Sequence, residues 1–421
     1  MWDLEVGMRE AALRDGSKAL SSLLNEIPDY YEDDTFCTSC SIPMINLGRR
    51  EKNITSLLGE GTLSRTYYQC ADPDCNGHRF PKDEMLDVAS TSFSPGVRRL
   101  MSKSGSNDAF DKGRLDLEEY SGIKIDTKDL ERISEKIGSE IEEWQKTERK
   151  NILSQEMPIH PLKSIPVMYI EYDGTGIPVI PEEVKGRKGK QTDGTSKTRE
   201  VKTGCIFTQT GTDENNRPVR DSGSTTYVAA IETAEVFGKR IEAEAIRRGM
   251  WYAAIVVVLG DGAAWIWNLA EHYFYGAIHI VDFYHAKEHL HKLLQLLFLT
   301  QEKIKEQEPE WVKWLGEGNI DKIIKTAKNI YNASNQTSDE TEREIGYFEG
   351  NIDRMRYAEY KKMGLFIGSG VIEAGCKNVI GKRLKQSGMR WSVRGANDII
   401  ALRCSILSDR FDEYWEGRSA I

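Results

Sequence analysis

Two runs of apolar residues in the middle of the chain give the strongest periodic signal. Val167–Tyr172 and Ile255–Gly260 are rich in β-branched and aromatic residues, and runs of that length and composition are typical of buried strands. A further strand pattern at Thr225–Ile231 is followed by a helical pattern at Thr233–Arg248. Residues 161–285 therefore alternate strands and helices, as expected for an α/β domain.

Helical periodicity dominates the rest of the chain. Residues 1–35 are expected to form one amphipathic helix that runs into an acidic loop, and residues 83–160 contain capped helical patterns. Beyond His285 the pattern stays helical to about residue 362. A last helical segment follows, with an i, i+4 stripe that should face the sheet: Ile372, Cys376, Ile380 and Leu384.

Three carboxylates occupy positions that suit metal-dependent chemistry. Asp173 ends the first apolar run and Asp261 ends the second, so both should be held at the edge of a rigid sheet. Glu373 lies one residue beyond Ile372, about 100° around the helix, where it can reach toward that edge. Hard divalent cations prefer oxygen ligands. We therefore expect two Mg²⁺ (or Mn²⁺) ions at these residues, an arrangement that activates an attacking oxygen and stabilises a leaving oxygen.

Four of the seven cysteines lie in two pairs near the start of the chain. Cys37 and Cys40 form a tight knuckle, and Cys70 and Cys75 form a looser one. Two such pairs can close a tetrahedron around a structural Zn²⁺ in a ribbon too small to fold without metal. His78 is a competing fourth ligand, and a set of reduced, buried cysteines is the alternative. The odd cysteine count favours a reducing compartment over disulfides.

Charge is unevenly distributed along the chain. The net charge of −9 argues mildly against a nucleic-acid partner, but residues 185–202 hold seven basic against two acidic residues, and residues 374–410 hold eight against two. Local patches decide where a phosphate backbone docks, although such a run can also be a solvated surface. The candidate DNA contacts are Arg187, Lys188, Lys190, Arg199, Lys202, Lys377, Lys382, Arg383, Lys385, Arg390 and Arg394, with Trp391 as a possible platform for an unpaired base.

A short histidine motif follows the predicted strand Ala277–Val281. His285, Glu288 and His289 match the pattern of inverted zinc metalloproteases. Five-residue matches are common by chance, and a protease site would leave Asp173 and Asp261 without a role. We therefore interpret Asp282 and His285 as residues that support the carboxylate cluster.

Several motifs resemble the Kra-type (ISKra group) bacterial insertion-sequence transposases of the DDE class. They are Tyr172–Val179, Gly186–Lys190, Thr198–Lys202, Gly223–Tyr227, Leu259–Leu269, Val281–Ala286 and the segment from Gly368 to Trp391. The resemblance runs from about residue 36 to 405 and implies a core similar to ribonuclease H. It implies that Asp173, Asp261 and Glu373 are the catalytic triad. The four residues between Cys70 and Cys75 depart from the usual knuckle.

The expected fold class is α/β: a ribonuclease-H-like mixed-sheet catalytic core interrupted by an all-helical insertion, preceded by a zinc ribbon and a helical DNA-binding region. The expected segments are an N-terminal helix (1–35), the zinc ribbon (36–82), the helical DNA-binding region (83–160), the first part of the core (161–285), the helical insertion (286–365), the second part of the core with the Glu373 helix (366–410) and a tail (411–421).

The function expected from this combination is transposition. The enzyme would cleave DNA at the ends of an insertion sequence and join them to target DNA, acting as a homodimer on the terminal inverted repeats. The alternatives are a ribonuclease-H-like nuclease or resolvase that cuts without joining, and a catalytically silent domesticated DNA-binding protein. With no apolar run of about 18 residues and no signal-peptide pattern, we expect a cytoplasmic, nucleoid-associated protein with no membrane contact.

Overall fold

The computed structural model describes residues 1–29, 35–156, 164–189, 194–334 and 338–418. The chain divides into two compact units, Met1–Ile137 and Gly138–Ile421. Within the described residues, none of the helices is long and apolar enough to cross a lipid bilayer.

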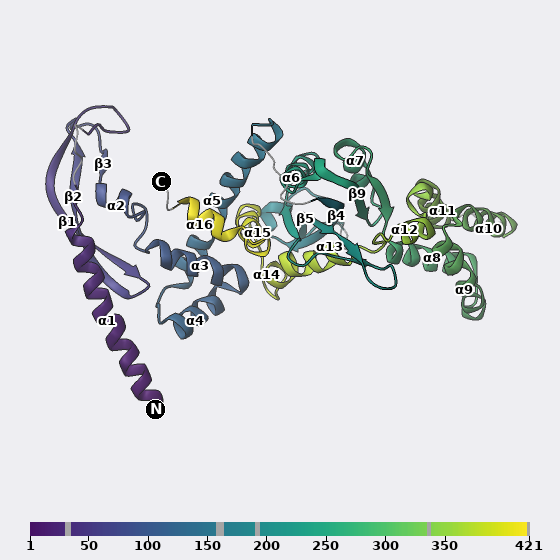
Figure 1. Ribbon diagram of the computed structural model, residues 1–421, viewed down its shortest axis with the longest axis horizontal. Helices are drawn as coiled ribbons and strands as arrows, with labels where there is room; N and C mark the ends of the chain where they lie inside the picture. Colours follow the sequence, from purple (N-terminus) through teal and green to yellow (C-terminus); the bar gives the residue numbers. More distant parts are fainter. Residues whose placement is uncertain (30–34, 157–163, 190–193, 335–337, 419–421) are drawn as a thin grey trace. The chain divides into compact units, whose positions relative to one another are not determined.

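The first unit combines a long helix with a small antiparallel sheet (Figure 1). Helix α1 (Trp2–Glu26) packs along a hairpin of β1 (Met44–Ser56) and β2 (Gly59–Cys70), and the short β3 (His78–Arg79) pairs with β2. The small apolar core contains Ile54, Leu63 and Val88, with Leu24 packed against it. This hairpin occupies the chain between the two cysteine pairs.

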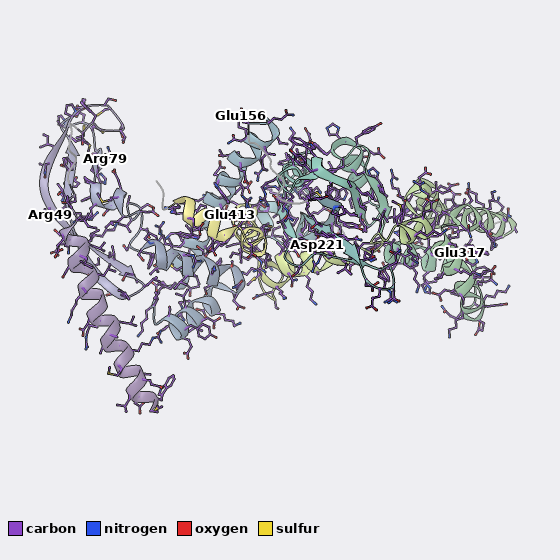
Figure 2. The ribbon with its side chains drawn as sticks, in the orientation of Figure 1. Arg49, Arg79, Glu156, Asp221, Glu317 and Glu413 are labelled. Carbon is purple, nitrogen blue, oxygen red and sulfur yellow. The ribbon has the colours of Figure 1, made fainter. Side chains whose placement is uncertain are left out.

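Ion pairs fasten the hairpin to its neighbours. Arg49 pairs with Asp29 at 3.2 Å, and Arg79 on β3 pairs with Glu84 at 2.6 Å (Arg49 and Arg79 are labelled in Figure 2). Asp29 is buried and also accepts a hydrogen bond from the backbone N–H of Thr66. Buried carboxylates with such partners are costly to disturb, so these contacts hold the edge of the small sheet in place.

The helices expected after the cysteine region are also present. They are α2 (Pro81–Met85), α3 (Pro95–Asn107), α4 (Phe110–Ser121) and α5 (Thr127–Leu153). Ser94 caps α3 by accepting a hydrogen bond from the backbone N–H of Val97, and Pro95 occupies the first helical position, where its missing N–H costs nothing.

The second unit is built on a five-stranded mixed sheet with the order β10-β9-β4-β5-β8. The strands are β4 (Ile165–Pro178), β5 (Thr198–Gln209), β8 (Thr226–Ala230), β9 (Ala253–Gly260) and β10 (Ile278–Val281). β4, β9 and β10 run parallel, and β5 is antiparallel to both of its neighbours. In sequence order the sheet strands are therefore arranged 3-2-1-4-5; a separate small hairpin, β6 (Gly211–Thr212) and β7 (Pro218–Val219), follows β5.

Different parts of the chain cover the two faces of this sheet. Helices α6 (Ala234–Arg247) and α7 (Ala264–Tyr273) pack on one face, where Tyr172 contacts Phe237 and Trp265. The segment from Gly364 into α13 (Gly370–Gly375) crosses the other face. Figure 1 shows α6 and α7 on the opposite side of β4 and β5 from α13.

The helices between β10 and α13 form a separate layer with a core of large apolar residues that includes Trp311, Ile323 and Phe348. They are α8 (Phe283–Leu297), α9 (Gln301–Glu317), α10 (Ile320–Ala333), α11 (Asp339–Gly350) and α12 (Tyr357–Lys362). The two ends of this segment meet, because the backbone N–H of Phe283 donates to the carbonyl of Ile367 at 2.8 Å. The chain therefore leaves and re-enters the sheet layer at one place.

The last helical segment is not one regular α-helix. Between α13 and α14 (Lys382–Leu384), residues Cys376–Gly381 form a π-helical turn. Arg403 on α15 (Val393–Leu407) donates to the carbonyls of Val379 (2.6 Å) and Asn378, and such external donors stabilise a widened turn. The expected apolar stripe nevertheless faces inward, with Ile372, Ile380 and Leu384 buried.

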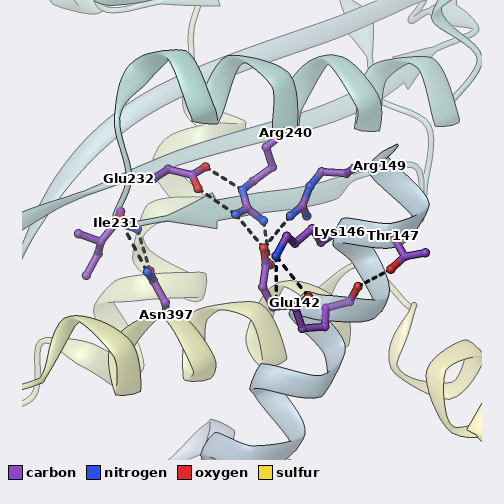
Figure 3. A network of polar contacts seen from close by, with 9 residues as sticks. Glu142, Lys146, Thr147, Arg149, Ile231, Glu232, Arg240 and Asn397 are labelled. Carbon is purple, nitrogen blue, oxygen red and sulfur yellow. Dashed lines mark hydrogen bonds and ion pairs between the residues drawn. The ribbon is translucent and has the colours of Figure 1, made fainter. Parts of the chain in front are cut away.

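A network of charged side chains anchors the second half of α5 to the sheet layer. Arg240 of α6 contacts Glu142 at 2.9 Å and Glu232 at 2.8 Å, and Arg149 contacts Glu142 at 2.6 Å (Figure 3). Burial by itself raises the pKa of Glu142, but Arg240 and Arg149 together lower that pKa below its ordinary value. The network therefore requires Glu142 as a carboxylate.

Candidate active site

The two predicted aspartates lie within or directly after neighbouring parallel strands. Glu171 on β4 pairs with Leu259 on β9; Asp173 lies two residues further along β4, and Asp261 directly follows the last residue of β9. Residues paired in this way point to the same face of a sheet. That face is the one crossed by α13, because Asp173 is in register with Thr203 and Glu171 with Cys205, and α13 contacts Glu171.

Asp282 extends the same row. Val281 on β10 pairs with Gly260 on β9, and the backbone N–H of Asp282 donates to the carbonyl of Gly260 at 2.8 Å. Asp261 and Asp282 therefore directly follow the carboxyl ends of β9 and β10. Asp173, which the sequence pattern placed at the end of a strand, instead lies within β4, because pairing with β5 continues that strand to Pro178. Asp282 is buried, whereas Asp173 and Asp261 are half-buried and accessible.

The loop after β9 fixes Asp261 tightly. Its Oδ1 accepts the backbone N–H of Ala263 at 2.9 Å, at the start of α7. Gly262 has φ +98°, and a Cβ there would lie 2.7 Å from the Tyr347 ring. The Tyr347 hydroxyl donates to the carbonyl of Asp261 at 3.3 Å, so α11 supports this loop.

Glu373 lies on α13 above the same face of the sheet, with its side chain exposed. Its Oε1 is 3.4 Å from the Ser369 hydroxyl. The helix is docked by its backbone: the N–H of Ile372 donates to Glu171 Oε2 at 2.8 Å, and the N–H of Ser369 donates to Asp282 Oδ2. Two hydrogen bonds from the helix backbone to Glu171 and Asp282 therefore hold the helix that carries Glu373 against the sheet.

Glu171 is a site residue that the sequence pattern did not single out. It has no exposed surface, and burial raises its pKa to about 8, with further increases from nearby Asp282 and Glu373. The available signal was a lone acidic residue inside the apolar run Val167–Tyr172. Ionisable groups are rarely buried without a role, so an acid within a buried strand is itself a sign of a site.

The two residues predicted to support the site, Asp282 and His285, have different surroundings. Asp282 Oδ1 accepts the backbone N–H of His285 at 2.7 Å and caps α8. His285 is half-buried, and its Nδ1 lies 3.7 Å from Glu288 Oε2 one turn along the helix. His289 instead contacts Glu344 at 2.6 Å and stacks on Tyr347. The two histidines therefore have different partners and do not converge on one metal position, so the structure gives no support to a zinc protease site.

The three predicted catalytic carboxylates are not drawn into one tight group. Within the described ranges, the only set of three or more potential metal ligands whose atoms all lie within 4.8 Å of one another is Cys37, Cys40, Cys70 and Cys75. The oxygens of Asp173, Asp261 and Glu373 are therefore further apart than those four sulfur atoms.

The four cysteines converge as a candidate metal centre in the first unit. Cys37 and Cys75 sulfurs are 3.7 Å apart, and those of Cys40 and Cys70 are 3.4 Å apart. Backbone hydrogen bonds from Ser39 and Cys40 lower the pKa of the Cys37 thiol to about 6, which favours the thiolate that a metal binds. Four sulfur donors in this geometry could hold a structural metal such as zinc.

His78 is not part of this sulfur cluster. Its Nδ1 instead lies 3.3 Å from the carbonyl of Asn76. Gly77, two residues after Cys75, passes directly beside the cluster, since a Cβ at that position would lie 2.3 Å from the Cys37 sulfur. The chain must therefore pass close to the cluster there without a side chain.

The two basic stretches meet in space beside the candidate carboxylates. The backbone N–H of Ile180 donates to the carbonyl of Trp391, and that of Trp391 donates to Pro178. Lys385 Nζ donates to Thr175 Oγ1 at 2.5 Å, close to Asp173 in β4. The exposed members of the candidate DNA surface are Arg187, Lys188, Lys377, Lys382, Lys385, Arg390 and Arg394, with Arg199 half-buried.

Three of the predicted DNA contacts have buried side chains. Lys202 points to the opposite face of the sheet, where its Nζ lies 4.6 Å from the Trp265 ring centre. Arg383 packs its guanidinium 4.9 Å from the Trp391 ring centre. Trp391 donates its indole N–H to the carbonyl of Leu384 and is not available for a base. The remaining candidate, Lys190, lies outside the described residues.

Comparison with known proteins gives one family match. Residues 44–410 match the model of an uncharacterised protein family (UPF0236). No curated protein sequence matches the chain. Among solved structures, the chain is similar to the Drosophila P element transposase strand transfer complex, with a TM-score of 0.25 and 7% sequence identity over 81% of this chain and 84% of that one. A likeness at that level carries no functional argument.

Proposed function

The chain belongs to the uncharacterised protein family UPF0236, and we propose that it is a DDE transposase of the Kra type. The observation that carries the proposal is the placement of Asp173 within β4 and of Asp261 directly after the neighbouring parallel strand β9, with the helix that bears Glu373 docked on Glu171 of β4. Active sites of open α/β sheets lie beyond the carboxyl ends of the strands. The strand order 3-2-1-4-5 agrees with the ribonuclease-H-like core that the sequence motifs imply.

Each carboxylate has a role in this proposal. Asp173 and Asp261 would hold two Mg²⁺ or Mn²⁺ ions, and Glu373 would complete one of the two sites. When bound, the ions activate the attacking oxygen and stabilise the leaving oxygen of a phosphodiester. Oxygen donors of this kind suit those cations. Because Glu373 is exposed on α13, its carboxylate is free to turn toward the sheet edge.

The chemistry proceeds in two displacements at phosphorus. A water oxygen first bonds to the phosphorus at the end of the element, and the bond to the 3′ oxygen breaks, leaving a free 3′-hydroxyl. That hydroxyl then bonds to a phosphorus in target DNA, and the target's own 3′ oxygen leaves with the proton. Neither step forms a covalent bond to the protein, so the residues position DNA and cations.

The DNA strands would lie along the exposed basic side chains beside Asp173. Lys382, Lys385 and Arg390 come from one stretch of sequence and Arg187 and Lys188 from another, and both border the same sheet edge. Such side chains hold the phosphate backbone. The cysteine ribbon and the helices after it are proposed readers of the terminal inverted repeats, and the helices α8–α12 a homodimer interface.

The test is an excision-and-joining assay with purified protein, Mg²⁺ and DNA that carries the gene's own flanking sequence. Asp173→Asn and Glu373→Gln should each reduce cleavage and joining by about 100-fold or more. Glu306→Gln, an exposed acid on α9, is the matched control and should keep full activity. Cleavage without joining would replace the proposal with a nuclease. Binding without either reaction would favour a silent DNA-binding protein.

A further inference from the structure

A buried acid beneath the Glu373 helix has no role in the proposed chemistry. Glu171 precedes Asp173 by two residues on β4 and has no exposed surface. Its Oε2 accepts hydrogen bonds from the backbone N–H of Ile372 at 2.8 Å and from the Cys205 thiol at 3.8 Å. Its Oε1 has no hydrogen-bond partner among the described residues. A buried carboxyl group with one oxygen unsatisfied costs stability.

Because burying the Glu171 carboxyl group costs stability, packing alone does not explain why an acid occupies this position. An apolar side chain of similar volume would fill the same space among Cys205, Ile372 and the sheet without desolvating a carboxyl group, and replacements of that kind are often neutral or stabilising. What an apolar side chain would not supply is an acceptor for the Ile372 N–H. That amide lies in the first turn of α13, where helical N–H groups have no partner within the helix.

A second buried acid, Asp282, likewise accepts a backbone N–H at the start of α13, that of Ser369, three residues before Ile372. Asp282 accepts the backbone N–H of Ser369 through Oδ2 and that of His285 through Oδ1. The start of α13 is therefore held at two points by carboxyl groups, one within β4 and one directly after β10, with β9 between these two strands. Ile372 immediately precedes Glu373, so fixing its amide fixes the Cα of Glu373 relative to Asp173 on the same strand as Glu171.

We propose that Glu171 is a positioning residue that sets the distance between Glu373 and the two aspartates by anchoring the backbone of α13 to β4. This inference rests on the proposed function for its catalytic consequence. Glu171 would not touch DNA or a cation, because it is fully covered and its bonded oxygen faces the helix backbone.

Two substitutions separate anchoring from other roles. Glu171→Gln keeps an acceptor oxygen of the same reach, and Glu171→Met keeps the volume but removes the acceptor. Ile170→Met, on the same strand but the opposite face, is the control for general loosening of β4. The full-length protein is used throughout, and circular dichroism and thermal unfolding establish that each variant is folded.

The first readout is hydrogen–deuterium exchange of the segment 366–376, which needs no enzymatic activity. Loss of one hydrogen bond should speed exchange in this segment by about fivefold in Glu171→Met, and Glu171→Gln and Ile170→Met should match the wild type. Equal protection in Glu171→Met and wild type would overturn the anchoring itself. Because this readout is independent of DNA cleavage, its result stands even if the transposase proposal fails.

The second readout is DNA cleavage as a function of Mg²⁺ concentration. Glu171→Met should lose about 100-fold in rate, as for misplacement of a reacting group, and should need more Mg²⁺ for half-maximal rate. Glu171→Gln should stay within about threefold of wild type, since it retains the acceptor. If Glu171→Gln were as inactive as Asp173→Asn, Glu171 would be acting as a charged ligand and the positioning role would be refuted.

Discussion

Two glycines beside candidate ligands show how single residues shape these sites. Gly262 follows Asp261 in the left-handed region, with the Tyr347 ring occupying the place of a side chain. Gly77 lies against the sulfur of Cys37. Only glycine allows the backbone to approach so closely, so both positions link local backbone geometry directly to the placement of a ligand.

Gly262→Ala should displace the loop that carries Asp261. We expect a loss of about 2 kcal/mol in the free energy of unfolding, from backbone strain and a clash with Tyr347, together with strongly reduced DNA cleavage. Gly276→Ala is the control, since Gly276 has φ +85° but no atom within 4 Å of the added Cβ. It should lose about 1 kcal/mol and keep its activity. Chemical denaturation and the cleavage assay measure both effects, and equal loss of activity in both variants would contradict the prediction.

Gly77→Ala should impair metal binding by the cysteine ribbon. The new Cβ would lie 2.3 Å from the Cys37 sulfur, so the four sulfurs could not keep their arrangement around an ion. Zinc content measured by mass spectrometry should fall well below that of Gly48→Ala, a control in β1 with φ +88° and no atom within 4 Å. Equal zinc in both variants would show that the cysteines do not act as one site.

At the scale of elements, α5 depends on charge as well as on apolar packing. Its second half carries Glu142, which joins Arg149 of the same helix to Arg240 of α6 (Figure 3). Removing one partner from a buried pair leaves an uncompensated charge. The π turn after α13 is likewise an element-scale feature, since it needs donors from Arg403 on another helix.

Glu142→Gln should destabilise the protein at neutral pH by about 3 kcal/mol. The folded-state pKa of Glu142 is lowered, so its contribution is full above the ordinary glutamate pKa. That contribution is lost as pH falls through the ordinary value, about 4.3, toward the lowered folded value. The stability difference between wild type and variant should therefore shrink in acid. Glu143→Gln is the control, because Glu143 makes only an exposed pair with Lys146, and denaturation at several pH values tests both.

At the scale of the whole chain, long-range hydrogen bonds decide which residues are neighbours. The helices α8–α12 separate Asp282 from Ser369 by 87 positions, yet the two are hydrogen-bonded. Two basic stretches that are far apart in sequence border the same strand end, because Trp391 pairs with the backbone at Pro178 and Ile180. The candidate DNA surface exists only through this pairing.

Replacing Lys382 and Arg390 together by alanine should weaken binding to DNA similarly for all sequences. The slope of log affinity against log salt concentration should fall by about 0.9 for each phosphate that the protein no longer neutralises. Lys305→Ala with Lys313→Ala, two exposed lysines on α9, removes the same charge elsewhere. Fluorescence anisotropy over a range of salt concentrations measures both slopes. Identical slopes for the two double variants would remove this surface from the proposed DNA path.

The sequence by itself determined those features of the protein that depend on residues close together in the chain. Apolar runs predicted β4 and β9, Asp261 directly follows its strand as expected, and cysteine spacing predicted a cluster that the structure brings together, whereas β4 continues past Asp173 to Pro178. Only the tertiary structure decided that β4 and β9 are parallel neighbours, that Lys202, Arg383 and Trp391 are buried, and that the backbone of α13 donates to Glu171. Strand pairing and side-chain partners depend on residues distant in sequence, so no local pattern can specify them.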